Sequence, residues 1–157
     1  MRARSTASRV HAAAGVTAFA VISLFLISSA AVELAGNPAA IATVKQAIAW
    51  GLLLLIPALA ATGGSGFAMV GGSPGGLAGA KLRRMRFIAA NGVLVLVPSA
   101  LYLAWKAGQG AFDGGFALVQ AIEFAAGGAN LVLMGLNIRD GLAMTKRRRS
   151  RPAISTR

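Results

Sequence analysis

Four polar residues in an otherwise apolar segment carry the strongest chemical signal in the chain. Gln120, Glu123, Asn130 and Asn137 are separated by 3, 7 and 7 positions. At about 3.6 residues per turn, these positions share one face of a helix. Together with Asn91 of the preceding apolar segment, we call these residues the polar stripe. An ionised carboxyl inside a membrane is costly unless it is paired, hydrated or protonated, so the stripe should face the interior of a helix bundle.

Glu123 has two interpretations. Removal from water favours the protonated form of a carboxyl, and a membrane carboxyl of this kind can carry protons or bind a cation. Alternatively, Glu123 bonds to Gln120, Asn91 or a backbone carbonyl and holds helices together, each hydrogen bond contributing about 0.6 kcal/mol. Gly127 and Gly128 lie beside the stripe and allow another helix to approach closely, which favours the packing role.

Two prolines interrupt apolar segments at matching places. Pro57 follows Gly51 by six residues, and Pro98 follows Gly92 by the same distance. Proline lacks a backbone N–H and clashes with the preceding turn, so the sequence predicts helix kinks at Pro57 and Pro98 near mid-membrane. The matched spacing resembles the inverted, interrupted helices of some transporters. Convergence between apolar segments is the simpler explanation.

His11 is the only histidine of the chain. A haem with protein ligands on both faces would require a second His11 in a dimer, or Met85 or Met144 as the other ligand. A solvated histidine at the membrane interface is the simpler interpretation, and we expect no cofactor. With four acidic residues and no cysteine, the chain has few means to assemble a nucleophile with its base, or a metal site. We therefore expect neither enzyme activity nor a bound metal.

Four apolar segments, at residues 10–32, 41–62, 85–105 and 116–138, must position these side chains. Each reaches the roughly 20 residues that a membrane-spanning helix needs. Apolar residues make up 56% of the chain, charged residues 13%, and the mean hydropathy is +0.68, outside the range of soluble globular domains. The sequence therefore predicts an all-α fold, a polytopic transmembrane four-helix bundle over residues 1–142. We expect the basic tail at 143–157 to be disordered.

The Lys and Arg residues predict the orientation in the membrane. Three precede the first apolar segment, four lie between the second and third, and seven follow the fourth, whereas only Lys45 and Lys106 fall in the alternate loops. Short loops rich in Lys and Arg stay in the cytoplasm, so both termini should be cytoplasmic. Cations close to the spans are expected to bind lipid headgroups, including anionic ones. They are Arg83, Arg84, Arg86, Lys146, Arg147, Arg148 and Arg149.

Three further features of the sequence concern the basic tail, the first apolar segment and a glycine-rich stretch. The basic tail has no interleaved aromatic residue to stack on bases, which argues against nucleic acid as a partner. The first apolar segment is longer than the roughly 7 to 15 residues of a signal-peptide core, which favours a retained span over a cleaved one. The glycine-rich stretch at residues 63–80 lacks the Walker pattern and is predicted to be a flexible linker.

Three motifs carry a resemblance to a protein family. They are ATGGSGF at residues 61–67, RRMRFIAANG at 83–92 and LMGLNIRDGL at 133–142. With these motifs the chain resembles an uncharacterised family of small bacterial four-span inner-membrane proteins. The resemblance implies a bacterial inner membrane, and it implies no activity, cofactor or catalytic residue.

The sequence thus leads to one expected function and two alternatives. We expect a multi-pass protein of the bacterial cytoplasmic membrane that serves as a non-catalytic structural or accessory component. Its expected partners are membrane lipids and either a second copy of the chain or a larger membrane protein. The first alternative is a small transporter or proton-coupled carrier that uses Glu123 and the polar stripe. The second is a haem-binding redox subunit that uses His11.

Overall fold

The computed structural model describes residues 2–69 and 76–149, with most side chains between residues 6 and 143. Every regular element in these ranges is helical, and no strand occurs in them. The elements are α1 (Arg2–Ala35), α2 (Pro38–Met69), α3 (Gly76–Asn91), the π-helical turn η1 (Gly92–Leu96), α4 (Val97–Gly108) and α5 (Gly114–Arg149). This confirms the predicted all-α fold.

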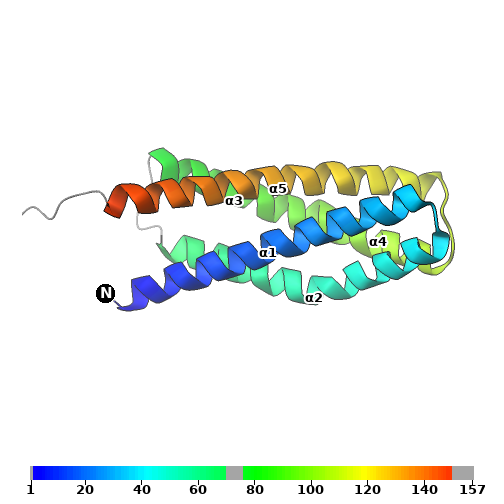
Figure 1. Ribbon diagram of the computed structural model, residues 1–157, viewed down its shortest axis with the longest axis horizontal. Helices are drawn as coiled ribbons and strands as arrows, with labels where there is room; N and C mark the ends of the chain where they lie inside the picture. The colour runs from blue at the N-terminus through cyan, green and yellow to red at the C-terminus, as the bar shows by residue number, and fades with distance from the viewer. Residues whose placement is uncertain (1, 70–75, 150–157) are drawn as a thin grey trace, which may run out of the picture.

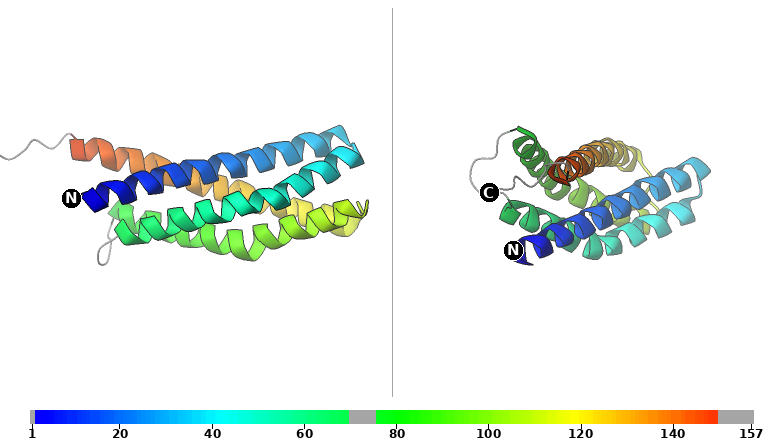
Figure 2. Two further views of the ribbon diagram at one scale, coloured as in Figure 1. Left: turned by 90° about the horizontal axis from the view of Figure 1, so that it is seen from below. Right: turned by 60° about the vertical axis from the view of Figure 1, so that its left-hand side comes forward.

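The elements form four antiparallel rods, because α3, η1 and α4 follow one another as a single rod (Figures 1 and 2). The start of α1, the end of α2, the start of α3 and the end of α5 lie at one end of the bundle (Figure 1). We call this the terminal end. The opposite end, where α1 turns into α2 and α4 turns into α5, is the turn end. Each rod packs against two neighbours: α1 against α2 and α5, and the α3–η1–α4 rod likewise against α2 and α5.

Each rod is long and apolar enough to cross a membrane. The four candidate spans are Thr6–Ala35, Pro38–Gly66, Gly79–Gly108 and Gly114–Ala143, with 29 or 30 residues each. At about 1.5 Å per residue, such helices cover the hydrocarbon core and the headgroup regions of a bilayer. They contain the four predicted apolar segments and extend beyond them, because helical hydrogen bonding continues past the last apolar residue.

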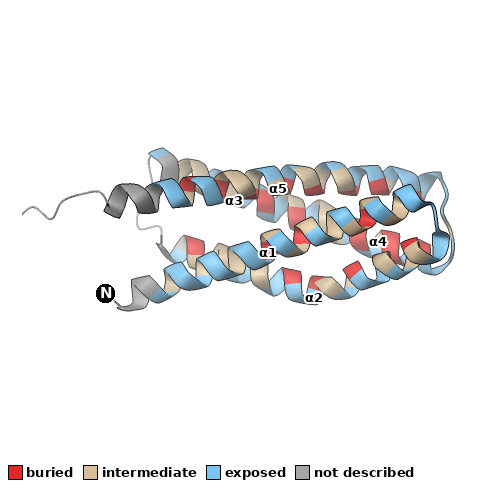
Figure 3. Cartoon of the chain, viewed as in Figure 1, coloured by how far each residue is buried: buried red, intermediate tan, exposed pale blue. Residues whose placement is uncertain are grey.

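The bundle has a small core and an apolar outside. The main core cluster consists of Ala18, Ile22, Ile48, Leu52, Leu55, Ile88, Ala100 and Met134. Large apolar side chains also point outwards, such as Leu34 at 90% exposure and Trp50 at 72%. Buried residues therefore follow a narrow inner strip of each helix (Figure 3). An apolar exterior of this extent suits contact with lipid.

The turn end is closed by two short, capped connections. Gly36 and Gly110 have φ of 65° and 66°, a left-handed conformation that glycine adopts without strain. Asn37 caps α2 by accepting the N–H groups of Ala39 and Ala40. Asp113 accepts the N–H of Phe116 at 3.0 Å and forms an ion pair with Lys106. The hydrogen bond from Lys106, and then that from Phe116, lower the pKa of Asp113.

The terminal end is more helical than the sequence predicted. α2 continues to Met69 and α3 starts at Gly76, so residues 63–69 and 76–80 are helical. The predicted flexible linker over 63–80 is therefore wrong in these parts. The physical reason is that a helix satisfies its own backbone groups where water is scarce, and Gly66 is buried inside the bundle. α5 likewise extends to Arg149, and residues 150–157 of the predicted tail lie outside the described range.

The two prolines occupy different settings. Pro57 lies inside α2. Pro98 follows η1 directly, as the second residue of α4. The wider π-helical turn accommodates the missing N–H and the bulk of the Pro98 ring against the preceding carbonyls. Kinks at Pro57 and Pro98 stay predictions, and the structure adds the π-helical turn as a local irregularity that the sequence did not predict.

Candidate functional site

The most deeply buried polar contact is an ion pair between α2 and α5. Lys45 Nζ lies 2.8 Å from Glu123 Oε2 and donates a second hydrogen bond to Ser29 Oγ at 3.0 Å. The Lys45 side chain is 0% exposed, and Glu123 and Ser29 are also buried. Gln120 Nε2 donates to the same carboxylate oxygen at 3.3 Å. Three helices, α1, α2 and α5, are therefore joined at one point.

Lys45 corrects the sequence analysis, which assigned it to a loop outside the membrane. α2 starts at Pro38, so Lys45 lies about two turns inside the helix. A signal for this pair existed in the sequence. Lys45 is seven residues from the start of α2, and Glu123 is nine residues from the start of α5. Both helices start at the turn end, so the two residues lie at similar depth.

The pair explains how Glu123 is tolerated in the bundle. A carboxylate removed from water is strongly destabilised unless an opposite charge and hydrogen bonds replace its hydration. Lys45 supplies the charge, and Gln120 supplies a further hydrogen bond. Of the partners expected from the sequence, Gln120 contacts Glu123, whereas Asn91 bonds elsewhere.

A small cavity adjoins the ion pair. It has a volume of about 40 Å³, and its walls are mostly apolar apart from Ser29 and Glu123. Gln120 Oε1 is buried and has no hydrogen-bond partner among the described residues. A cavity needs about 10–15 Å³ to hold a water molecule. The surroundings of Glu123 therefore offer room for a water beside the carboxylate.

Asn91 and Asn130 form a second cluster nearer the middle of the bundle. Asn91 Nδ2 donates to Asn130 Oδ1 and to the carbonyl of Ala126, both at 2.9 Å. Asn130 is 0% exposed and donates to the carbonyl of Ile88 at 3.4 Å. The two amides thus tie α3 to α5 through side chains and backbone. Two members of the predicted polar stripe, Asn91 and Asn130, are therefore in direct contact.

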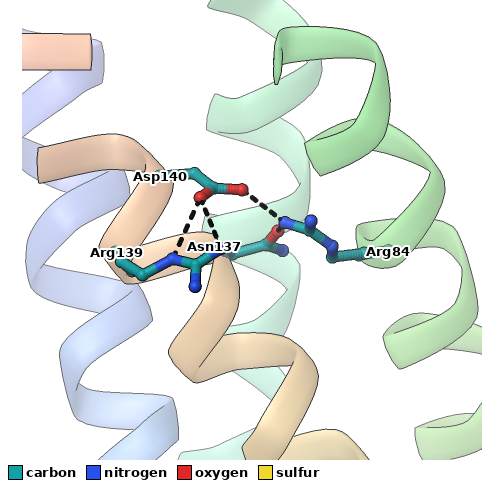
Figure 4. A network of polar contacts seen from close by, with 4 residues as sticks. All are labelled: Arg84, Asn137, Arg139 and Asp140. Carbon is teal, nitrogen blue, oxygen red and sulfur yellow. Dashed lines mark hydrogen bonds and ion pairs between the residues drawn. The ribbon is translucent and has the colours of Figure 1, made fainter. Parts of the chain in front are cut away.

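A third cluster lies near the terminal end (Figure 4). Arg84 of α3 forms an ion pair with Asp140 of α5 at 2.6 Å and a hydrogen bond with Asn137 at 3.3 Å. Arg139 approaches the other carboxylate oxygen of Asp140 at 3.3 Å. Asp140 was missed by the sequence analysis. Its signal was a lone acidic residue among many cations at the end of the fourth apolar segment.

The remaining predicted headgroup-binding residues are placed as follows. Arg83 and Arg86 are exposed on α3 near the terminal end. Arg84 differs from them because its guanidinium contacts Asp140, as described above. The side chains of Lys146, Arg147, Arg148 and Arg149 lie outside the described residues.

His11 lies on α1 and contacts the end of α2. Its Nδ1 is 2.9 Å from the carbonyl oxygen of Thr62, and Ser65 Oγ lies 3.4 Å from the same nitrogen. His11 is half-buried, and its position at the membrane interface stays a prediction. Among the described residues, no group of three or more His, Cys, Asp and Glu side chains is placed to hold a metal ion.

Comparisons with protein families, curated proteins and solved structures gave no match to this chain. The resemblance described above therefore depends on its three sequence motifs alone.

Removing one partner of the Lys45–Glu123 pair should destabilise the protein. Lys45→Met and Glu123→Leu each leave an uncompensated buried charge, which costs about 3–5 kcal/mol for a buried pair. The double variant Lys45→Met with Glu123→Leu removes both charges and should unfold at a higher temperature than either single variant. Thermal unfolding in one mild detergent measures the difference.

Trp50→Leu provides the control, because Trp50 is on α2 but points outwards at 72% exposure. Its unfolding temperature should stay close to that of the parent chain. A double variant no more stable than the two single variants would contradict a structural ion pair between Lys45 and Glu123.

Proposed function

We propose that the protein is a multi-pass protein of the bacterial cytoplasmic membrane and a non-catalytic structural or accessory component there. The observation that carries the proposal is that residues of the polar stripe form hydrogen bonds between helices. Glu123, Asn130 and Asn137 of the stripe form hydrogen bonds to neighbouring helices at three depths, with Lys45, the carbonyl of Ile88 and Arg84 respectively. Hydrogen bonds of this kind between helices hold a membrane bundle together. Four apolar helices long enough to span a bilayer support the membrane location.

The proposed orientation places both termini in the cytoplasm. The exposed cations Arg83 and Arg86 lie near the terminal end. At the other end, Lys45 and Lys106 are both paired with acidic residues. Pairing cancels their charge, so the contrast between the two ends is stronger than a count of Lys and Arg suggests. The rule that cationic loops stay in the cytoplasm then supports a cytoplasmic terminal end.

An accessory component should be isolated together with its partner. The full-length chain, tagged and extracted in mild detergent, is expected to elute either as a homo-oligomer or with another membrane protein in stoichiometric amount. Native mass spectrometry and protein identification distinguish these two outcomes. A monomer isolated without a stoichiometric partner would contradict the proposal.

Single-cysteine variants test the orientation, and the chain offers no background because it has no cysteine. Gln109→Cys at the turn end should react with a membrane-impermeant maleimide in intact cells. Gly75→Cys, in the connection between α2 and α3, should react only after the membrane is permeabilised. The reverse pattern would place the termini outside the cytoplasm.

A proton-coupled carrier is the second candidate, and the cavity of about 40 Å³ beside Glu123 is the observation that favours it. A water there would place an exchangeable proton next to the carboxylate. If Glu123 carries protons, Glu123→Gln should abolish proton flux into proteoliposomes that contain a pH-sensitive dye. Flux equal to that of the parent protein would exclude this role. The double variant Lys45→Met with Glu123→Leu, which has no charge at either position, shows whether proton flux also stops when both charges are removed.

A further inference from the structure

A second hollow, larger than the cavity beside Glu123, lies near the terminal end. It has a volume of about 610 Å³, and residues of α1, α2, α3 and α5 line it. Its wall runs from Ser8 to Val16 on α1 and from Lys81 to Ala89 on α3. Eight residues of helix correspond to about 12 Å. The hollow therefore extends along the helices, and its volume is in the range of sites for organic ligands, about 300–1,000 Å³.

The hollow is open at the side of the bundle, between α1 and α5. These two helices diverge towards the terminal end (Figures 1 and 2). Deeper in the bundle they are in contact, since a Cβ on Gly127 of α5 would lie 2.6 Å from Leu26 Cδ1 of α1. Among the lining residues of the diverging parts, Val16 of α1 is 59% exposed and Leu142 of α5 is 68% exposed. The hollow can thus be entered from the side, where lipid surrounds a membrane-spanning helix.

The wall of the hollow changes from apolar to polar along the bundle axis. The part farther from the terminal end is lined by apolar side chains, which are Val16, Leu59, Ile88 and Met134. The part nearest the terminal end is lined by polar and charged side chains, which are Ser8, His11 and Lys81. Thr62 and Asn137, between these parts, already form hydrogen bonds inside the bundle. A phospholipid has the same order of groups, with a polar headgroup at the membrane surface and chains in the hydrocarbon core.

Lys81 is a cation without an acidic partner of its own. Its Nζ lies against α5, since a Cβ on Gly141 would be 3.5 Å from it. Of the four acidic residues of the chain, Asp140 is the one near the terminal end, and it forms ion pairs with Arg84 and Arg139. Within the described ranges, Lys81 forms no ion pair. The half-buried Lys81 therefore adds to an excess of positive charge, which an anionic ligand would balance.

We propose that the hollow is a binding site for one anionic phospholipid of the surrounding membrane. One acyl chain enters between α1 and α5 and lies along the apolar wall, and the phosphate binds the ammonium of Lys81. A zwitterionic lipid is disfavoured, because its own cation would be added to a site that already has excess positive charge. The proposal needs the membrane location of the protein, and it depends neither on the accessory role nor on the orientation of the termini.

The test uses the full-length protein in detergent, freed of co-purified lipid and then titrated with lipid. The two probes are phosphatidylglycerol and phosphatidylcholine with the same oleoyl chains, and native mass spectrometry counts the lipids that each chain retains. We expect one phosphatidylglycerol per chain, bound at least about fivefold more tightly than phosphatidylcholine, which is the effect of one cation close to anionic headgroups.

Lys81→Gln tests the headgroup contact. It should lower the affinity for phosphatidylglycerol to that for phosphatidylcholine, because the charge that distinguishes the two lipids is removed. Arg9→Gln is the matched control, since Arg9 is exposed on α1 at the same end of the bundle and does not line the hollow. This variant loses the same charge and should keep the preference for phosphatidylglycerol.

Gly63→Phe tests the place of the acyl chain. Gly63 lines the hollow, and a Cβ on it would have nothing within 4 Å, so a large side chain can fill the space without a clash at its base. This variant should lose the tightly bound lipid. Gly64→Phe is the control, because Gly64 has the same free space but does not line the hollow. Circular dichroism and size-exclusion profiles show whether each variant folds, and Lys81→Gln decides the matter if Gly63→Phe does not.

Several results would overturn the proposal. They are a parent protein that retains no lipid or binds both lipids equally, a preference for phosphatidylglycerol that survives in Lys81→Gln, and equal lipid binding by folded Gly63→Phe and Gly64→Phe. A dimeric parent protein that becomes monomeric in Gly63→Phe would assign the hollow to a second copy of the chain and also overturn it. None of these results depends on a stoichiometric protein partner, so the accessory role is tested separately.

Discussion

A charge inside a low-dielectric bundle needs an opposite charge, and the contact between Lys45 and Glu123 meets this requirement. The pair fixes the relative depth of α2 and α5, because a shift of one turn would move the two charges apart by about 5.4 Å. Ser29 extends the constraint to α1 through its hydrogen bond with Lys45. The packing of three of the four rods at the turn end therefore depends on this contact.

The two ends of the bundle differ in how tightly the helices pack. The turn end combines the buried ion pair with short capped connections at Gly36 and Gly110, and only a cavity of about 40 Å³ adjoins Glu123 there. The terminal end is held by the Arg84–Asp140 pair on one side and has a partly open hollow of about 610 Å³.

The sequence predicted the helices better than the contacts between them. The spacing of Asn130 and Asn137 correctly placed both in buried positions on one face of α5, since helical periodicity is a local property. The interpretation of Lys45 as a loop residue was wrong. A charged residue near the end of an apolar segment was placed in the adjacent loop, whereas the structure places it in the helix with an acidic partner. His11 was interpreted as solvated, since nothing local indicates that Thr62 and Met85 lie beside it.

By itself, the sequence determined that four apolar segments form helices long enough to cross a membrane and that one helix carries a polar stripe, because both properties depend on composition and periodicity within a segment. Only the tertiary structure decided that Lys45 pairs with Glu123, that Arg84 pairs with Asp140 and that Met85 lies beside His11. Such contacts depend on the register between helices. An apolar helix surface carries little information about register, because surfaces that face lipid and surfaces that face another helix have the same composition.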